Sequence, residues 1–562
     1  MFYAGWRTSP LKYELVNRLS EELGVSHTMA AVLARRGLAQ PEAAREFLFE
    51  EGRLHDPFLF PSMGDVCARL RAAATQKETV CIHGDYDVDG VTATALLVET
   101  MRGLGSAARA HLPNRFSEGY GVSSAAIERM AADGVSLLVT VDCGITALAE
   151  VELARRLGMD IIVIDHHRPG EGGLPDALIV SPLVCDYPFK HLAGVGLAFK
   201  VAQALAGNEA SAPAGLTPEL TGLLDLVALG TIADVVPLVG ENRALVKRGL
   251  VQMARTRRPG LRSLMSVTRT DPLRVTAGQV AFRLAPRINA AGRLEDPAPA
   301  LELLMTGDAA EGERLASELD SLNQERQKIE NRILAESHAM VSVWPAEVAG
   351  ARGYVLSSAG WHEGVIGIVA SRMVEQYGRP VIMISESDTH GKGSGRGIRG
   401  FDLHAALTGL SPLLAAFGGH SAACGLTIEN GSIEEFRTAF ARHADAHIAE
   451  EDLAAFHQVD AVVSGRELTL ELADELARLE PFGMGNPSVD LLAGGVRITG
   501  ARKTRDGQHF QCAVESSGAR ASAVGFRQAD LADRVGERPT WDAVFRLEKN
   551  EYNGSVAPQL NL

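Results

Sequence analysis

Acidic and histidine residues recur directly after apolar runs in the first half of the chain. Each run has the length of a strand, and each cluster behind it could ligate a metal or move a proton. In open α/β sheets, ligands bind beyond the carboxyl ends of the strands, so such clusters should converge on one place. Four clusters follow strands in this way: His83-Gly-Asp85-Tyr-Asp87-Val-Asp89 after TVCI, Asp142 after LLVTV, Asp165-His166-His167 after IIVI, and Asp234 in GTIADVVPL.

Several carboxylates that share one site repel one another, and burial disfavours their charged forms. Divalent cations resolve this conflict, and mixed carboxylate and imidazole ligands suit Mn²⁺ or, less well, Mg²⁺ or Zn²⁺. The candidate ligands, roughly six, suffice for two ions that share a bridging carboxylate. Two ions about 4 Å apart can activate water and stabilise the leaving oxygen in phosphoester hydrolysis. A calcium loop is excluded, because Leu96 occupies the position where that loop needs glutamate.

The elements that position these clusters form an α/β pattern. From about residue 78 to 240, buried apolar strands alternate with helical patterns, which predicts a mostly parallel sheet with helices on both faces. Residues 308–343 predict one long helix. A second α/β pattern follows, and short alternating runs near the C-terminus predict a small antiparallel barrel. The predicted fold class is α/β, with two α/β domains joined by a long helix and a C-terminal β-barrel.

Composition excludes several classes of protein. The chain has 562 residues, of which 46% are apolar and 22% charged, so low-complexity disorder is excluded and three to four domains are expected. No apolar run is long enough for a transmembrane helix, and the N-terminus lacks the features of a signal peptide. Six cysteines without a CxxC pair argue against a disulfide scaffold or a zinc ribbon and favour the cytoplasm.

The net charge of −15 differs from that of a generic polyanion binder, which would normally be basic. Nucleic acid would therefore be held by local patches or through metal ions. Residues 247–274 carry eight basic side chains against Asp271 alone, a balance of +7. This segment is either a nucleic-acid patch or a solvated loop and helix face.

The four clusters, in this order and spacing, resemble the DHH phosphoesterase superfamily. Five further motifs are similar to its RecJ family of bacterial 5′→3′ exonucleases specific for single-stranded DNA: LPNRFSEGYG (112–121), RINAAGRL (287–294), WHEGVIGIVASR (361–372), GSGRGIRG (393–400) and PFGMGNP (481–487). The resemblance extends from about residue 60 almost to the C-terminus. Residues 1–60 predict a helical segment from their own apolar pattern. The resemblance implies a DHH catalytic domain (61–270), a connecting helical region (271–343), a DHHA1-type substrate-binding domain (344–450) and an OB-type nucleic-acid-binding domain (451–562).

The resemblance also implies roles for the clustered residues. His83 and Asp87 would bind one Mn²⁺ or Mg²⁺ ion. Asp142 would bridge to a second ion, which Asp89, His166 and Asp234 would complete. His167 would face the scissile phosphate as a hydrogen-bond donor or proton source, and Asp165 would orient a histidine, as metal-bound histidines usually require. Asp85 could act like Asp165 and is left unassigned.

Binding of a strand needs further residues. Arginine suits a 5′-phosphate pocket, which makes Arg115 and the Ser394 and Arg396 pair candidates that would meet across a cleft. Further candidates are Tyr120 for base stacking, Arg287, Asn289 and Arg293 for the strand backbone, and His420 in GGHSAACG for a phosphate oxygen. The alternatives are a packing role for Tyr120, a tight turn at His420 and bracing of the long helix by Arg287. Gly397 replaces a serine that commonly follows GSGR in the family.

Two other functions occur in the same superfamily. A DHH-type phosphodiesterase of short oligonucleotides or cyclic dinucleotides usually lacks the barrel and PFGMGNP, as does an inorganic pyrophosphatase. A non-catalytic DNA-binding scaffold would have lost metal ligands, which are all present here. The resemblance therefore implies an exonuclease that acts in recombination and repair on single-stranded DNA. Single-strand-binding protein and a RecQ-type helicase are its implied partners, and a monomer is its implied state.

Overall fold

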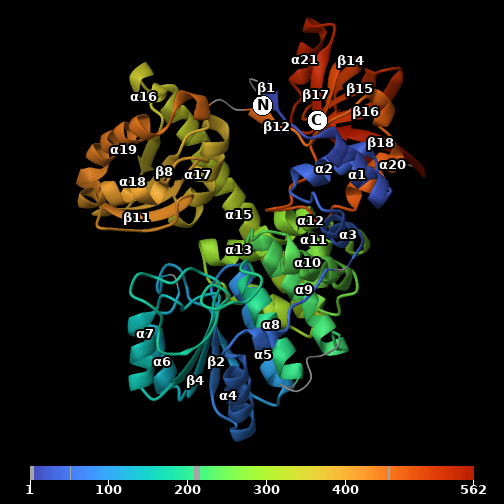
Figure 1. Cartoon of the computed structure of the whole chain (residues 1–562). Helices are drawn as coiled ribbons and strands as arrows, with labels where there is room; N and C mark the ends of the chain where they lie inside the picture. The colour runs from blue at the N-terminus through green and yellow to red at the C-terminus, as the bar shows by residue number, and fades with distance from the viewer. Residues whose placement is uncertain (1–4, 51, 120, 208–214, 454–455, 553) are drawn as a thin grey trace. The chain divides into compact units, whose positions relative to one another are not determined.

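The computed structural model describes residues 5–50, 52–119, 121–207, 215–453, 456–552 and 554–562. The chain divides into two compact units (Figure 1). The larger unit contains Trp6–Asn289, Pro297–Ala316 and Gln458–Leu562, and the smaller unit contains Ala290–Asp296, Ser317–His457 and the first residues of the chain. Within the described ranges, no helix is long and apolar enough to cross a membrane.

A five-stranded parallel sheet, built from residues 80–180, lies in the larger unit. Its order is β3-β2-β4-β5-β6, and every neighbouring pair is parallel. The inner strands β2 and β4 are buried at every position, which explains why their sequences are continuous apolar runs. The strands are β2 (Val80–His83), β3 (Arg109–His111), β4 (Leu137–Val141), β5 (Asp160–Ile164) and β6 (Leu178–Val180).

Helices cover both faces of this sheet, as predicted (Figure 1). On one face, Ile127 of α6 (Ser124–Ala132) and Val151 of α7 (Leu148–Arg156) share a core with Leu138. The other face is packed against three helices: α4 (Met63–Gln76), α5 (Val88–Gly103) and α8 (Gly194–Ala206).

Further helices complete this part of the larger unit. Helix α9 (Pro218–Ala233) packs against α5, α8 and α10 (Gly240–Met253). After it come α11 (Pro259–Val267), α12 (Ala277–Gln279), the π-helix η3 (Val280–Leu284), α13 (Ala285–Leu294) and α14 (Ala298–Met305).

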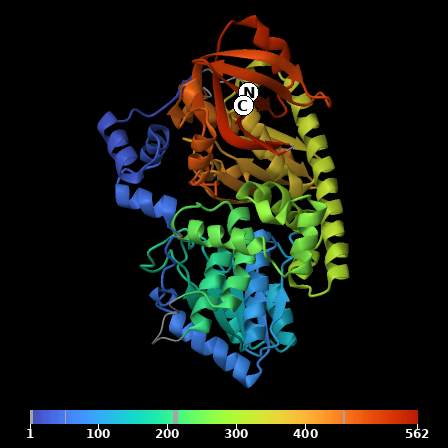
Figure 2. The same ribbon diagram turned by 90° about the vertical axis from the view of Figure 1, so that its right-hand side faces the viewer.

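The predicted long helix is confirmed as α15 (Ala309–Ser342), which Figure 2 shows along its length. Its buried side chains include Leu315, Leu319 and Ile333, at the helical spacing that the sequence predicted. The helix begins in the larger unit and continues into the smaller one.

The smaller unit has a mixed five-stranded sheet in the order β10-β11-β9-β8-β7, of which only β7 and β8 pair in parallel. Alternate residues of β7 face opposite cores: Leu356 packs with α15 and α17, and Val355 with α18 and α19. The elements are β7 (Tyr354–Ser358), β8 (Val381–Glu386), β9 (His390–Arg396), β10 (Ala416–Gly419), β11 (Ala423–Glu429), α16 (Ala346–Gly350), α17 (Glu363–Tyr377), α18 (Leu403–Gly409) and α19 (Ile433–His447).

The C-terminal strands close into the predicted barrel, because β14 pairs with both β15 and β17. One pairing inside the barrel, β16 with β18, is parallel, so the barrel is not wholly antiparallel. Phe510 and Phe545 lie in its core, whereas Phe526 is half exposed. The elements are β13 (Ala461–Val462), α20 (Leu470–Ala477), β14 (Leu491–Lys503), β15 (Phe510–Ser516), β16 (Ala519–Gly525), α21 (Leu531–Arg534), β17 (Trp541–Tyr552) and β18 (Ser555–Asn561).

The N-terminal segment shares the core of the barrel. Leu19, Met29 and Leu48 pack in one cluster with Leu491 and Phe545. The segment is helical, as predicted, apart from one short strand that pairs with β12 (Phe456–Gln458). Its elements are β1 (Gly5–Arg7), α1 (Tyr13–Leu23), α2 (His27–Arg35) and α3 (Pro41–Phe49).

Candidate active site

Three of the four predicted clusters lie at the carboxyl edge of the parallel sheet. His83 ends β2, Asp142 follows β4, and the Asp165–His167 cluster follows β5. Asp87 is the N-cap of α5, where its Oδ1 accepts hydrogen bonds from the backbone N–H groups of Asp89 (2.9 Å) and Gly90 (3.1 Å). The short connection from β2 to α5 therefore brings three acidic residues, Asp85 included, to this edge.

The fourth cluster corrects the prediction. Asp234 reaches the site from the C-terminal end of helix α9, not from a strand. Most of α9 from Leu220 to Ile232 is buried, so its sequence lacks the polar face that marks an ordinary amphipathic helix. A continuous apolar run of this kind cannot be told from a buried strand by periodicity.

The ligand atoms of the clusters lie close together. His166 is central, because its Nε2 lies 3.0 Å from Asp142 Oδ1, 3.7 Å from Asp234 Oδ2 and 3.9 Å from Asp89 Oδ2. Among the described residues, three groups offer one ligand atom per residue with all of these atoms within 4.8 Å of one another: Asp85, Asp87 and Asp142; Asp89, His166 and Asp234; and Asp142, His166 and His167. Asp142 thus belongs to two of these groups, and its Oδ1 lies 3.0 Å from His166 of the third, a position that suits a bridging ligand.

Burial and mutual repulsion make it costly to keep the carboxylates at this edge in their charged form. Burial, followed by the charge of neighbouring carboxylates, raises the pKa of Asp85, Asp142 and Asp234 well above the usual range. The same causes raise the pKa of Asp89 to about 7. Burial lowers the pKa of His166 to about 4, which favours the neutral imidazole that metals bind. A bound cation would offset the cost of keeping these carboxylates charged.

Two buried atoms here also have no hydrogen-bond partner among the described residues, namely His83 Nδ1 and Asp234 Oδ2. Buried polar atoms are rarely left unsatisfied, and an ion is one explanation. His83 joins none of the three groups above, and its Nε2 lies 3.3 Å from the carbonyl oxygen of Gly121. The donor set nevertheless fits two divalent ions.

The backbone around Asp142 and Asp89 is built for close approach. Asp142 has φ of +63°, a conformation that only a few residue types adopt readily. The first two N–H groups of α8, from Gly194 and Val195, donate to Asp89 at 2.6 and 2.8 Å. A Cβ on Gly194 would lie 2.7 Å from the Asp142 side chain, so only glycine lets the helix start here.

Asp165 contacts His167 rather than the central histidine, His166. Its Oδ1 lies 2.8 Å from His167 Nδ1, and its Oδ2 accepts a hydrogen bond from the N–H of Ile145 at 2.9 Å. Burial lowers the pKa of His167, but the hydrogen bond and charge of Asp165 outweigh it and leave the pKa above its usual value. Asp165 therefore fixes the ring and favours its protonated form.

Arg115 and Tyr120 were predicted to bind the strand near the metal ligands, and of these two Arg115 lies within the described residues. The guanidinium of Arg115 lies over the ring of Tyr86, 4.4 Å from its centroid, and its charge acts on Asp85. Arg115 therefore stands next to the acidic edge. Tyr120 lies outside the described residues.

The candidates of the RINAAGRL motif contact protein groups in this structure. Asn289 Oδ1 accepts a hydrogen bond from the N–H of Val88 at 3.2 Å, which ties α13 to the first turn of α5. Arg287 donates to the carbonyl oxygen of Arg283 at 2.6 Å, and Arg293 donates to that of Gly364 at 3.4 Å. At least Asn289 thus helps to position the helix that carries Asp89.

The remaining candidates lie in the smaller unit. Ser394 and Arg396 are on β9, where Arg396 donates to Ser394 Oγ at 3.1 Å and to the carbonyl oxygen of Gly395 at 2.8 Å. His420 follows β10, and its N–H donates to the carbonyl oxygen of Ala423 at 2.8 Å. Gly397 donates to the carbonyl oxygen of Ala422 at 2.8 Å, which ties the GSGR and GGHSAACG segments together.

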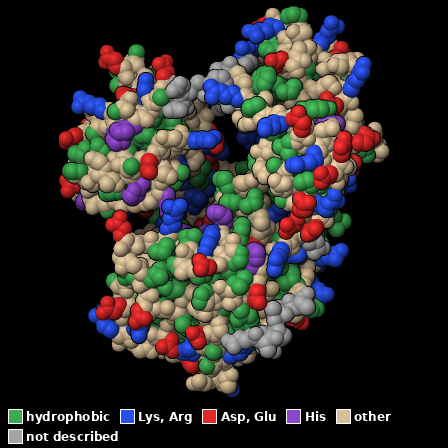
Figure 3. All heavy atoms as spheres, in the orientation of Figure 1, with side chains coloured by type: hydrophobic (Ala, Val, Ile, Leu, Met, Phe, Trp, Pro, Cys, Tyr) green, Lys and Arg blue, Asp and Glu red, His purple; other side chains and the backbone are tan. Residues whose placement is uncertain are grey.

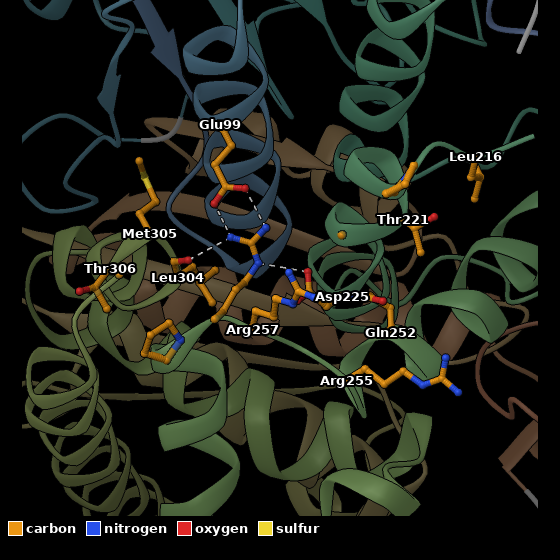
Figure 4. Close-up of a pocket in the computed structure, with 15 residues that line it drawn as sticks. Glu99, Leu216, Thr221, Asp225, Gln252, Arg255, Arg257, Leu304, Met305 and Thr306 are labelled. Carbon is orange, nitrogen blue, oxygen red and sulfur yellow. Dashed lines mark hydrogen bonds and ion pairs between the residues drawn. The ribbon is translucent and has the colours of Figure 1, made fainter.

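The basic segment 247–274 is in part internal. Arg258 forms ion pairs with Glu99 and Asp225, two carboxylates labelled in the pocket of Figure 4. Arg274 pairs with Glu551 at 2.8 Å. Figure 3 shows acidic and basic side chains interspersed on the visible face. The segment is therefore not one continuous cationic patch.

The sequence patterns assigned no role to Asp85, yet its carboxylate lies in one of the three groups that could hold a metal ion. The signal was present in the alternation of aspartates at 85, 87 and 89, which a strand end followed by a helix N-terminus brings to one edge. The hydrogen bonds from the N-terminus of α8 to Asp89 were not predicted. The glycines of AGVG at 193–196 were the available signal, because glycine at a helix start lets the backbone approach another group closely.

Family models match three parts of the chain: "DHH family, N-terminal domain" at residues 79–231, "DHHA1 domain" at 349–448 and "RecJ OB domain" at 459–562. The single-stranded-DNA-specific exonuclease RecJ of Bacillus subtilis is 38% identical over 99% of this chain and 70% of its own length. RecJ of Dickeya dadantii is 36% identical over 97% of this chain and 98% of its own.

The chain belongs to the RecJ family. A crystal structure of RecJ from Thermus thermophilus in complex with Mn²⁺ covers 99% of this chain and 78% of its own, with a TM-score of 0.84 and 32% identity. The same protein with Mg²⁺ gives a TM-score of 0.78. The RecJ family therefore includes structures that hold either of the ions predicted from the clusters, on the fold observed here.

Proposed function

We propose that this RecJ-family chain is a metal-dependent exonuclease that hydrolyses single-stranded DNA from its 5′ end and releases 5′-mononucleotides. The observation that carries this proposal is the arrangement at the sheet edge, where Asp142 belongs to two neighbouring ligand groups. A bridged pair of sites suits hydrolysis of a phosphodiester. The relatives that span nearly the whole chain are named single-stranded-DNA-specific exonucleases, which supports the coarser part of this proposal.

The donor set supports two Mn²⁺ or Mg²⁺ ions with defined ligands. One ion would be held by Asp85 and Asp87, with His83 as a further ligand through its unsatisfied Nδ1. The other would be held by Asp89, His166 and Asp234, and Asp142, 3.0 Å from His166, would serve both. When bound, such ions supply a nucleophile at neutral pH and offset charge that develops on the phosphate.

The side chains have separate tasks in this proposal. Asp165 accepts a hydrogen bond from the Nδ1–H of His167. The Nε2–H of the protonated ring is then the donor to the scissile phosphate. Asn289 and the α8 N-terminus hold the segment that carries Asp89. The catalytic residues are Asp142 and His167, and Asp165 is a positioning residue.

Strand-binding roles are proposed for residues of both units. Arg115 in the larger unit binds a phosphate group of the strand. In the smaller unit, Ser394, Arg396 and His420 bind phosphate groups, with Gly397 lacking the hydroxyl that the family commonly has. Tyr120 stacks on a base. Arg287 and Arg293 contact the strand backbone, since a guanidinium is well suited to phosphate oxygens.

The setting is proposed to be recombination and repair in the cytoplasm, with the chain as a monomer. All six cysteines are free thiols, which suits a reducing compartment. An exonuclease for single strands needs a source of them, so we propose that a RecQ-type helicase and single-strand-binding protein act with this chain.

A digest of labelled DNA with Mn²⁺ tests the function. We expect mononucleotides from a 5′-phosphorylated single strand, little product from the same strand with a blocked 5′ end, and none from a blunt duplex. EDTA should stop the reaction, and added Mn²⁺ should restore it. Hydrolysis of dinucleotides without cleavage of longer strands would refute the proposal and favour a short-oligonucleotide phosphodiesterase.

A further inference from the structure

Phe282 is an exposed aromatic residue in the helical run that continues directly into α13. Its exposed fraction is 83%, higher than that of any other large hydrophobic residue in the described ranges. A single exposed apolar side chain is ordinary on a protein surface. Its meaning therefore depends on what holds the ring outward and on what surrounds it.

The backbone directs this ring to solvent. Phe282 is the central residue of the π-helix Val280–Leu284, a rare turn that is frequent at functional sites. Val280 and Leu284 on either side are fully buried, and Ile288 continues the same buried stripe into α13. The segment is thus anchored through one face, and Phe282 stands on the other.

The segment around the ring is rich in arginine. Arg283 donates to the carbonyl oxygen of Arg269 at 3.3 Å, and Arg287 to that of Arg283 at 2.6 Å. Arg283 is thus held toward the turn that follows α11, and Arg287 toward the preceding turn of its own helical run. Residues 269–293 contain five arginines and one acidic residue, in a chain whose net charge is −15. The sequence next to Phe282 is therefore far more basic than the chain as a whole.

The same helical run leads to the metal-binding groups. Asn289 accepts a hydrogen bond from Val88 at the start of α5, between Asp87 and Asp89. Phe282 precedes Asn289 by seven residues, which is about 10 Å along a helix axis. A strand cut at the acidic edge could therefore pass over this ring within a few nucleotides.

We propose that Phe282 is a stacking platform for one base of the single strand, on the 3′ side of the scissile bond, with Arg283 and Arg287 beside the phosphates. This inference rests on the proposed function and adds a subsite to it. Aromatic rings flanked by arginines bind single strands without sequence preference, because every base has a stacking face. The local excess of basic residues favours this occupant over an apolar protein surface.

Kinetics of three variants test the platform. Phe282→Ala should raise KM for a long single strand about tenfold, the factor that corresponds to 1.4 kcal/mol, which lies within the range for stacking of one base. Its kcat should stay unchanged, and cleavage of a dinucleotide, which is too short to reach the ring, should not differ from wild type. Phe282→Trp should keep the wild-type KM. The matched control is Leu273→Ala, since Leu273 is also 81% exposed, and it should leave KM unaltered.

A binding measurement separates this inference from the proposed function. The indole fluorescence that the Phe282→Trp variant adds to the wild-type signal should be quenched by oligothymidylate in EDTA, where no cleavage occurs. Quenching without nuclease activity would retain the platform and refute the proposed function. Unchanged KM in Phe282→Ala together with no quenching in Phe282→Trp would overturn the platform. It would also be overturned if the wild-type chain formed dimers that Phe282→Ala abolished, because a second copy of the chain would then cover the ring.

Discussion

Replacing Asp142 by asparagine is expected to abolish cleavage while largely preserving binding of the strand. Asp142 belongs to the ligand group of Asp85 and Asp87 and lies 3.0 Å from His166 of the other, so loss of its charge should disturb both ions. The rate should fall by about 10⁴-fold or more, as when one member of a catalytic unit is removed. Asparagine is preferred to alanine because it tolerates the φ of +63° at this position. Single-turnover cleavage and fluorescence anisotropy of labelled DNA measure the two effects.

Asp160→Asn is the matched control for Asp142→Asn. Asp160 begins β5, at the opposite end of the same sheet, and its exposed carboxylate pairs with Arg69 at 2.7 Å. An exposed ion pair contributes little, so this variant should cleave at the wild-type rate. If Asp142→Asn lost cleavage and DNA binding to the same extent, the bridging role would be wrong.

Replacing Glu241 by alanine is expected to give the largest loss of stability. The carboxylate of Glu241 is buried against the Nζ of Lys200, and both side chains are fully inaccessible. It also accepts hydrogen bonds from Tyr187 Oη at 2.8 Å and from the N–H of His55 at 3.0 Å. Its removal leaves a buried ammonium without its counter-charge, a cost of about 3–5 kcal/mol. We expect the first melting transition to fall by about 10 °C.

The double variant Lys200→Met and Glu241→Met tests the cause of that loss. Replacing both charges with apolar groups of similar size is often neutral, so the double variant should melt well above Glu241→Ala. Burial lowers the pKa of Lys200 despite the nearby carboxylate, which is consistent with a costly charge. An unchanged melting temperature in Glu241→Ala, or a double variant no better than the single, would refute this explanation. Lys200 lies on α8, so the network also supports the helix that binds Asp89.

The sequence could predict the strand-borne part of the site because two local signals coincide there. Continuous apolar runs mark strands buried on both faces, and a chemically active residue such as Asp142 or Asp165 follows each run directly. Parallel strands place these ends at one edge. The apolar run before Asp234 identified that residue as well, but the predicted element was wrong, because α9 is a helix buried on nearly all sides.

Long-range contacts could not be predicted in the same way. The segment 247–274 has a strong local charge, yet Arg258 is neutralised by Glu99, which lies 159 residues away in the sequence. The N-terminal helices were identified, but nothing local indicates that Leu19 and Met29 pack into the core of the barrel. Phe282 lies two residues from the buried Val280 and Leu284, on the opposite face of the helical run, and its sequence surroundings alone did not identify it as an exposed ring.

The number of Mn²⁺ ions bound per chain shows whether two bridged metal sites exist at the carboxyl edge of the parallel sheet. The arrangement of Asp142 between two ligand groups predicts two ions whose paramagnetic resonance shows coupling, because a bridging carboxylate brings them to about 4 Å. Titration of the wild-type chain with Mn²⁺, followed by its resonance spectrum, gives both quantities. Two coupled ions would agree with the account. A single ion, or two ions without coupling, would contradict it.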